Sequence, residues 1–297
     1  MQAALVLHEL RRKSPQARWA FLIHQGVVFF AGYRPADCFA DDRPADGRPT
    51  SAVLKLLQGI FDRHRDHSFF LLRSRIYLSD PPGPMEKGFI DLVAKRFSVV
   101  EGEAVGRLEG PLEWREVVPL EDEYYETQLP TSTGQLTQRS LRTEEEIVAA
   151  LAELEAQIPR GDVLHDYSRP IGAILTRGEG EVVGHALHSG AINKTRHAEI
   201  DLIQGLFRAG FTPQKDERYT LYVSLKPCRM CAGTWAEVFT GFDLQVRYLR
   251  DDPGTKARGT ELEARGLIRP LGPPAPESAE GDRRSSRARP RPFRSEP

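Results

Sequence analysis

The chain has 297 residues, of which 40% are hydrophobic, and its formal net charge is −1 at pH 7. This length predicts about two domains, and the balanced charge gives no global reason to expect a polyanion or an anionic membrane as partner. No apolar run approaches the roughly 20 residues that span a bilayer, and three cysteines make a poor disulfide framework, so we expect a cytoplasmic protein without membrane contact.

Composition divides the chain into four zones. Residues 1–125 alternate apolar runs with turn signals and predict one domain, and the polar segment 126–142 predicts a linker. Residues 143–272 regain strong patterning and predict a second domain, whereas the Pro-, Ser- and Arg-rich residues 273–297 predict a disordered tail. The tail could form an electrostatic arm for nucleic acid, but a solvated terminus is the simpler interpretation because the rest of the chain is not basic.

Hydrophobic periodicity and turn signals place the elements along the chain. In the first domain, residues 18–33 resemble a hairpin. In the second, Thr143 and Glu146 have the spacing of a capping box, which predicts the start of a helix. The elements that follow are strands 171–177 and 181–188, helix 196–210, strand 219–225, helix 230–239, strand 244–249, helical turn 261–266 and strand 267–271. This alternation predicts crossovers and a partly parallel sheet covered by helices.

Two of the three cysteines, Cys228 and Cys231, follow a strand and open a helix in the stretch "LYVSLKPCRMCAG". Their spacing places both sulfurs on one face of the first helical turn, where the helix dipole favours thiolates. The chain has no second cysteine pair, so a histidine must supply a third ligand for zinc, and the best candidate is His197, which opens the preceding helix. One His and two Cys leave a fourth position for water, and Glu199 could act on that water as general acid and base.

The combination His197, Glu199, Pro227, Cys228 and Cys231 forms the H-x-E … P-C-x-x-C signature of zinc deaminases. Residues 143–272 therefore resemble the cytidine-deaminase-like superfamily, and "HAEI" and "LYVSLKPCRMCAG" are most similar to bacterial tRNA-adenosine deaminase. The resemblance implies a three-layer α/β/α fold with a five-stranded mixed sheet. It also implies one Zn²⁺ per chain and hydrolytic loss of an amine from cytosine or adenine.

The resemblance also suggests where a substrate would bind. Asn193 is the single asparagine of the chain and precedes the His197 helix together with Lys194 and Arg196. In the family, an asparagine near this loop contacts sugar or base, and the two cations could touch phosphate; a loop residue that tolerates unusual backbone angles is an equally good interpretation of Asn193. The full set of expected substrate-binding residues is Asn193, Arg196, Ala198, Ser224 and Pro227. We expect His185 and His188 to be structural or surface residues.

The first domain contains a diverged repeat of the second. "LLQGIF" (56–61) matches "LIQGLF" (202–207) at an offset of 146, and "YLSDPPGPMEKG" (77–88) matches "YVSLKPCRMCAG" (222–233) at an offset of 145. The positions equivalent to His197, Glu199, Cys228 and Cys231 are Ser51, Val53, Gly83 and Glu86. We therefore expect a tandem of deaminase-like domains whose first copy binds no zinc and catalyses nothing. A generic α/β domain is the alternative.

The functional hypothesis is a zinc-dependent hydrolytic deaminase that acts on a base within nucleic acid. Adenosine in tRNA is the first substrate to consider, followed by cytosine in RNA or single-stranded DNA. The first domain would serve as an intramolecular pseudo-dimer partner, and assembly of the chain into a homo-oligomer is a further possibility. The alternatives are a deaminase of free nucleosides or nucleotides and a non-enzymatic, zinc-stabilised binding protein.

Overall fold

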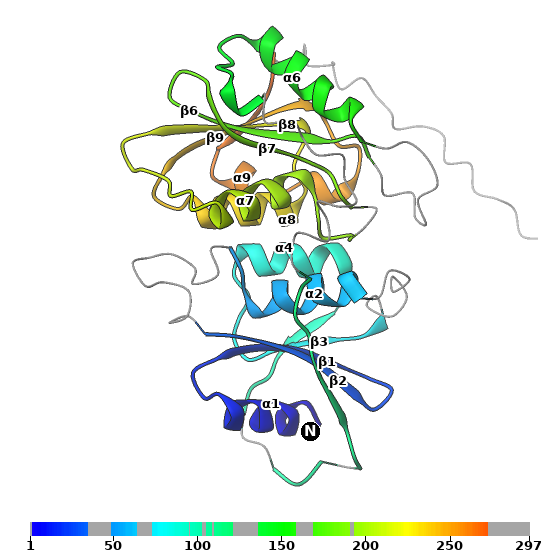
Figure 1. Ribbon diagram of the computed structural model, residues 1–297. Coiled ribbons are helices and arrows are strands. Elements are labelled where there is room, and N and C mark those ends of the chain that lie inside the picture. The colour runs from blue at the N-terminus through cyan, green and yellow to red at the C-terminus, as the bar shows by residue number, and fades with distance from the viewer. Residues whose placement is uncertain are drawn as a thin grey trace, which may run out of the picture.

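The computed structural model of the chain describes residues 2–34, 49–63, 73–94, 96–102, 105–108, 110–120, 136–158, 169–190 and 193–272. They form two five-stranded sheets, each with helices on both faces (Figure 1). The N-terminal domain, residues 2–120, contains α1 (Gln2–Lys13), β1 (Arg18–His24), β2 (Val27–Tyr33), α2 (Ala52–Arg63), β3 (Ile76–Leu78), α4 (Pro84–Val93), β4 (Phe97–Val99) and β5 (Glu113–Glu116). The C-terminal domain, residues 136–272, contains η2 (Leu136–Gln138), α6 (Glu144–Ala156), β6 (Gly172–Arg177), β7 (Glu181–Leu187), α7 (Ala198–Arg208), β8 (Arg218–Leu225), α8 (Arg229–Val238), β9 (Asp243–Arg250), η3 (Thr255–Ala257), α9 (Glu261–Ala264) and β10 (Ile268–Pro270).

The C-terminal domain has the predicted α/β/α fold with a five-stranded mixed sheet. Its strand order is β10-β9-β8-β6-β7, in which β6 runs antiparallel to both neighbours and β8, β9 and β10 run parallel. Helix α6 covers one face, and α7 and α8 cover the other (Figure 1). Apolar side chains of α7 and α8, among them Leu202, Ile203 and Trp235, fill the space beneath the second face. Val223 of β8 packs in this core. Strand β8 ends at Leu225, so the residues that follow it lie at the carboxyl edge of the sheet.

Local signals account for the element boundaries. The capping box is confirmed, since Thr143 Oγ1 accepts a hydrogen bond from the Glu146 amide at 3.2 Å and the Glu146 carboxylate accepts one from the Thr143 amide at 3.1 Å. Gly210 follows α7 with φ +82°, a left-handed conformation that ends the helix. Helix α7 begins at Ala198 rather than at the predicted residue 196, because His197 is extended (φ −83°, ψ 155°) and occupies the N-cap.

The N-terminal sheet repeats four strands of the C-terminal sheet. Its order is β4-β3-β1-β2-β5, with β1 antiparallel to β2 and β3, and β3 parallel to β4. Strands β1, β2, β3 and β4 therefore correspond in order and direction to β6, β7, β8 and β9. The fifth strands differ, because β5 pairs with β2 at one edge whereas β10 pairs with β9 at the opposite edge. The sequence repeat thus corresponds to a shared four-stranded core rather than to a complete second copy.

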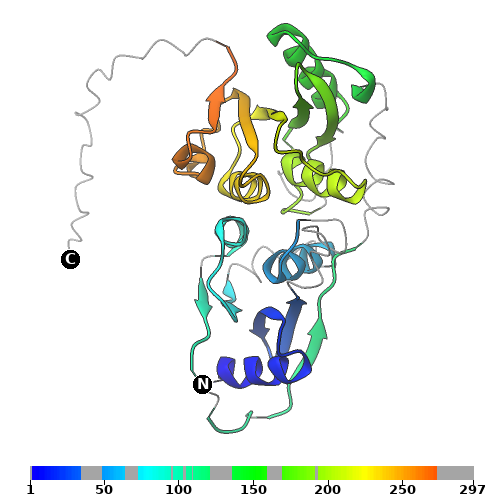
Figure 2. The same ribbon diagram turned by 90° about the vertical axis from the view of Figure 1, so that its left-hand side faces the viewer.

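The two domains meet through helices at equivalent positions. Helix α4 packs on α8, and α2 faces α7 (Figure 2). A Cβ atom on Gly88 would lie 2.6 Å from Met230 Cα, and one on Gly233 would lie 2.8 Å from the carbonyl carbon of Pro84, so both helices need glycine where they cross. Gly88 and Gly233 are 145 residues apart, which is the offset of the sequence repeat. Reciprocal contacts of this kind are the mark of a two-fold interface, and the domains therefore meet about an approximate two-fold axis.

A second reciprocal contact lies between α2 and α7. The side-chain amide of Gln58 donates to Gln204 Oε1, and that of Gln204 donates to Gln58 Oε1, both at 3.2 Å. Both side chains are buried, with 4% and 3% of their surface exposed, and they stand 146 residues apart. A buried amide pair that satisfies both partners fixes the register of the interface.

The polar segment 126–142 is only partly described. Residues 136–142 pack on the C-terminal domain, because Leu136 and Leu141 are buried against α6 and β6 and the Leu141 amide donates to Gly180 O. The second domain thus begins earlier than the predicted boundary at residue 143. Three parts of the chain lie outside the described residues: the rest of the predicted linker, the segment with the third cysteine, Cys38, and the tail 273–297. Among the described residues, no helix is both long enough and apolar enough to cross a bilayer.

Candidate metal centre and catalytic pocket

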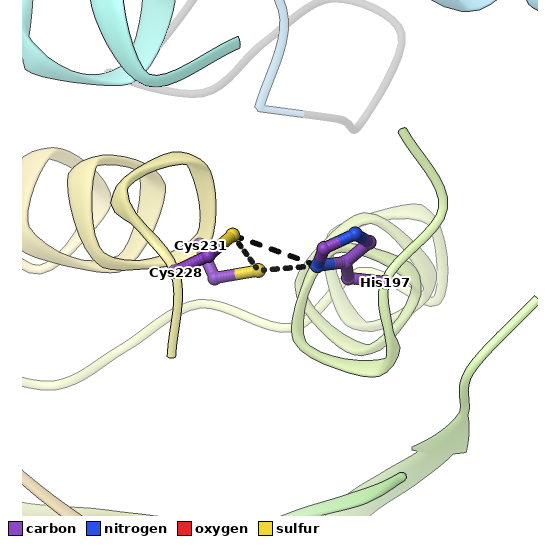
Figure 3. A group of neighbouring side chains, drawn as sticks. All are labelled: His197, Cys228 and Cys231. Atoms are coloured by element: carbon purple, nitrogen blue, oxygen red, sulfur yellow. Dashed lines mark hydrogen bonds between the residues drawn. The ribbon is translucent and has the colours of Figure 1, made fainter. Parts of the chain in front are cut away.

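Three side chains predicted as metal ligands come together at two helix N-termini. His197 is the N-cap of α7, Cys228 is the N-cap of α8, and Cys231 lies one turn into α8. His197 Nδ1 lies 3.6 Å from Cys228 Sγ and 3.5 Å from Cys231 Sγ, and the two sulfurs are 3.7 Å apart (Figure 3). Within the described part of the chain, these residues form the one group of three or more His, Cys, Asp or Glu side chains close enough to hold a metal ion.

The spacing of these three atoms fits a tetrahedral zinc ion. With Zn–S about 2.3 Å and Zn–N about 2.0–2.1 Å, tetrahedral angles give separations of about 3.8 Å between sulfurs and about 3.6 Å between sulfur and nitrogen. The observed separations of 3.7, 3.6 and 3.5 Å agree with these values. Both sulfurs lie at the positive end of the α8 dipole, and the hydrogen bond between the two cysteines together with the charge of His197 holds the pKa of the Cys228 thiol well below its usual value.

Glu199 lies beside this group as a buried carboxyl group. It sits in the first turn of α7, 3% exposed, and its backbone carbonyl accepts a hydrogen bond from Trp235 Nε1 at 3.0 Å. Burial raises the pKa of Glu199 to about 7, although the nearby His197 acts in the opposite direction. A carboxyl group that can hold or release a proton near neutral pH, beside a metal-binding group, suits general acid–base chemistry.

Asn193 joins the metal-binding loop to helix α2 of the N-terminal domain. Its side-chain amide donates to Gln58 O at 3.1 Å and to Asp62 Oδ1 at 2.6 Å, and both acceptors lie on α2. Its side-chain oxygen accepts from the Thr195 amide at 2.9 Å and from the Thr195 hydroxyl at 2.6 Å. Asn193 is 1% exposed, so these bonds tie the loop before His197 to the other domain.

Arg196 is buried in the same loop. It is 3% exposed and forms an ion pair with Asp201 at 3.2 Å, and Asp201 also accepts a hydrogen bond from the Ser189 hydroxyl. Neither Asn193 nor Arg196 lines the catalytic pocket, where sequence reasoning expected them to bind substrate. The partners of the Asn193 amide lie on α2 of the other domain, so the loop sequence alone does not reveal them.

We expect Asn193→Ala to lower the free energy of unfolding by about 1–3 kcal/mol, because Asp62, the Gln58 carbonyl and Thr195 each lose a buried partner. Chemical denaturation checks this value. Lys194→Ala is the matched control: the neighbouring Lys194 lines the pocket, so its loss should raise KM and leave the midpoint of denaturation unchanged. An Asn193→Ala protein with normal stability and a raised KM would instead mean that Asn193 contacts substrate.

The metal-binding group opens into a pocket of about 360 Å³, a size within the usual range for small-molecule sites. The lining residues are Leu92, Arg169, Ile171, His188, Gly190, Lys194, His197, Glu199, Leu225, Lys226, Cys228, Asp252, Gly254 and Lys256. None of the five predicted substrate-binding residues lines it, and all of them are buried: Asn193, Arg196, Ala198, Ser224 and Pro227. Ser224, for example, bonds the backbone of Gly172 through its hydroxyl.

His188, which was expected to be a structural or surface residue rather than a ligand, is not part of the three-residue metal group but lines the pocket beside it. Its ring meets the ring of His197 edge-on, with centroids 4.9 Å apart. It directly follows β7, whose end points toward the metal-binding loop. The position of His188 at the end of a predicted strand was the available signal, but the sequence alone did not show that this strand ends beside His197.

The equivalent positions of the N-terminal domain hold a different cluster, formed by Ser51, Val53, Gly83 and Glu86. Glu86 is hydrogen-bonded to Ser51, and its carboxylate accepts from the Gly83 amide at 3.2 Å. Burial raises the pKa of Glu86. The hydrogen bond between Ser51 and Glu86 thus joins the N-termini of α2 and α4. This place is equivalent to the one where His197, Cys228 and Cys231 meet in the C-terminal domain. We refer to this cluster as the degenerate site.

Comparison with known proteins identifies the C-terminal domain. Residues 162–270 match the model of the Bd3614-like deaminase family. No curated protein matches the chain. The matched residues lie within the C-terminal domain, which is therefore similar to the deaminases of this family.

Similar solved structures include three deaminases. A structure from work on A-to-I editing by tRNA:A34 deaminases is 26% identical, covers 34% of this chain and 77% of its own, and has a TM-score of 0.27. A diaminohydroxyphosphoribosylaminopyrimidine deaminase/5-amino-6-(5-phosphoribosylamino)uracil reductase from Thermotoga maritima is 21% identical, with coverages of 43% and 35% and a TM-score of 0.34. The dCMP deaminase of cyanophage S-TIM5 is 18% identical, with coverages of 43% and 96% and a TM-score of 0.29.

Proposed function

We propose that the protein is a zinc-dependent hydrolytic deaminase of a base within nucleic acid, with adenosine in tRNA as the first substrate to test. The observation that carries the proposal is the His197, Cys228 and Cys231 group, which has tetrahedral zinc spacing and lies beside the buried carboxyl group of Glu199. A purely structural zinc site would have four protein ligands. The described residues offer three, which leaves a position for a water molecule.

The chain's own residues account for the chemistry as follows. Zinc held by His197, Cys228 and Cys231 would supply Lewis-acid activation of a water molecule. Glu199 accepts one proton of that water molecule and delivers it to the ring nitrogen of the base, and it then accepts the second proton and delivers it to the departing amine, which leaves as ammonia. The first-turn position of Glu199 on α7 keeps that carboxylate beside the ligands, and its burial excludes bulk water from the proton transfer.

The charge of the pocket supports a substrate that carries phosphate. Arg169, Lys194, Lys226 and Lys256 line it, against the acidic side chains of Asp252 and Glu199. Each cation comes from a different segment of the C-terminal domain. Side chains of this kind can bind the phosphates that flank the reacting nucleotide in a polynucleotide, and the target base would leave its stack to reach the metal.

We also propose that the N-terminal domain is a diverged deaminase-like domain that neither binds zinc nor reacts and that serves as the pseudo-dimer partner of the catalytic domain. Its four-stranded core, the reciprocal contacts of Gly88 and Gly233 and the two sequence repeats support this proposal. The thiols of the metal site suit the reducing cytoplasm, where we expect the protein to act.

The test is nucleoside mass spectrometry on cells that express either the wild-type protein or Glu199→Ala, with tRNA, total RNA and DNA digested separately. We expect inosine or a uracil-type nucleoside that appears with the wild type and is absent with Glu199→Ala. The modified polymer then names the substrate, and the modified base distinguishes adenine from cytosine.

If no polymer changes, the nucleic-acid proposal is wrong, and purified protein should next be assayed on free nucleosides and nucleotides. Amine release from one of these would establish the free-nucleotide deaminase. A protein that binds zinc and releases no amine from any of them would be the zinc-stabilised binding protein.

A further inference from the structure

We propose that Leu92, on helix α4 of the N-terminal domain, is a wall of the catalytic pocket and a determinant of which base fits there. This inference rests on the proposed function of the site. Leu92 lines the pocket together with His197, Glu199 and Cys228, although it belongs to the domain that lacks the metal ligands. The other lining residues all come from the C-terminal domain. The catalytic pocket is therefore completed across the domain interface.

The end of α4 is fastened to the rest of the pocket wall. The Lys256 ammonium group donates a hydrogen bond to the backbone carbonyl of Asp91, next to Leu92. The Arg229 guanidinium lies 3.9 Å from the Asp91 carboxylate and also donates to Arg258 O at 3.1 Å. Because Lys256 itself lines the pocket, these contacts hold Leu92 and the loop of residues 252–258 in a fixed relation. Leu92 is thus a positioned wall rather than a surface side chain that happens to lie nearby.

The approximate two-fold axis shows that this helix position faces the partner's site in both domains. Leu92 is equivalent to Glu237 of α8 at the offset of 145. Glu237 enters the degenerate site, where its carboxylate accepts a hydrogen bond from the Met85 amide at 3.1 Å and lies 3.0 Å from the Cβ position of Gly83. Gly83 is the equivalent of Cys228, which Leu92 approaches in the other half. Each domain therefore projects one side chain, from the same helix position, into the site of the other.

The two side chains differ in chemistry. In the degenerate site, the exposed carboxylate of Glu237 accepts a hydrogen bond from the first turn of α4, beside Gly83. A carboxylate at position 92 would line the same pocket as the carboxyl group of Glu199, and it would offer a neutral base no apolar contact. Leucine supplies apolar surface beside Ile171 and Leu225, which also line the pocket. Flat, neutral bases bind well between apolar walls, so the size of residue 92 should decide how large a ring system fits.

Binding of two unreactive nucleosides tests the inference without relying on turnover. Purine ribonucleoside and 2-pyrimidinone ribonucleoside lack the amine that a deaminase removes, and they differ in ring size. Isothermal titration calorimetry of the zinc-loaded, full-length protein gives the Kd of each. We expect Leu92→Ala to change the ratio of the two Kd values by about tenfold, the order of effect that a few methyl or methylene groups have in an apolar pocket. Leu92→Trp, which fills the space, should weaken both by more than tenfold.

Val93→Ala is the matched control. Val93 is the next residue of α4 and is 1% exposed in the core of the N-terminal domain, so its substitution should lower the melting temperature without changing the ratio of the Kd values. If Leu92→Ala and Leu92→Trp fold with melting temperatures near that of the wild type and keep both wild-type Kd values, Leu92 is not a wall of the site. If zinc-loaded wild type binds neither nucleoside, this inference fails, whereas the proposed function stands or falls separately on the nucleoside mass spectrometry.

Discussion

Replacing Glu199 by glutamine should lower kcat by about 10²–10⁴-fold, the usual contribution of a general acid–base group, and leave the zinc content at one ion per chain. Glutamine keeps the size and hydrogen-bonding capacity of the side chain but cannot take up and release the proton. Glu199 is not one of the three ligand residues, so metal binding should survive. Steady-state kinetics on the substrate found by mass spectrometry, together with metal analysis of the same preparation, checks both parts.

Glu237→Gln provides the control for this substitution. It makes the same chemical change in a carboxylate that lies on α8 but faces the degenerate site, so we expect kcat to stay within about twofold of the wild type. The outcome that would sink the assignment is a Glu199→Gln protein with wild-type turnover. A Glu199→Gln protein that loses zinc would make Glu199 part of the metal site rather than its proton carrier.

The sequence was sufficient for the parts of the site that depend on short stretches of chain. His197 and Glu199 lie two residues apart at the start of one helix, and Cys228 and Cys231 lie three apart at the start of another. In each case the local backbone fixes the relation between the side chains, because both belong to the same N-terminal turn. The two strands that precede these helices were also predictable, and they place both turns at one edge of the sheet. This is why the sequence alone predicts the metal group.

The sequence was insufficient wherever the other domain decides the outcome. Asn193 has the residue type and the loop position of a substrate ligand, but Asp62 and Gln58 of α2 take up its side-chain amide. Leu92 belongs to an ordinary amphipathic helix, and its place in the pocket follows from the crossing of α4 and α8. The fifth strand of the N-terminal sheet departs from the expected tandem, since β5 pairs with β2, at the edge opposite to the one where β10 pairs with β9 in the C-terminal sheet.

The same interface governs the expected effect of removing the metal. Cys228 and Cys231 belong to a buried cluster that also contains Leu57, Met85 and Phe89 of the N-terminal domain. The metal-binding group thus lies within the apolar contact between the domains rather than at an isolated surface. Loss of the ion should therefore loosen both the catalytic pocket and the packing of α4 on α8.

We expect Cys228→Ser to lose the zinc ion and to unfold at a melting temperature about 8–16 °C lower than that of the zinc-loaded wild type. A ligand present at about a thousandfold excess over its Kd stabilises the folded state by about 4 kcal/mol. Each kcal/mol shifts the melting temperature of a domain of this size class by about 2–4 °C. Scanning calorimetry and metal analysis of the wild type, the chelated wild type and Cys228→Ser check the prediction, and zinc should restore only the chelated wild type.

Cys38→Ser is the control for this experiment, because Cys38 stands outside the motif and its loss should change neither zinc content nor melting temperature. Hydrogen exchange then locates the effect. Amides of α4 should exchange faster in the metal-free protein because their helix packs on α8, whereas amides of α1, on the far side of the N-terminal sheet, should keep their protection (Figure 1). If only the amides of α7 and α8 exchanged faster, the metal would support the catalytic domain alone. The domains would then be held together by the Gln58–Gln204 pair and by the crossing of α4 and α8 at Gly88 and Gly233, without a contribution from the ion.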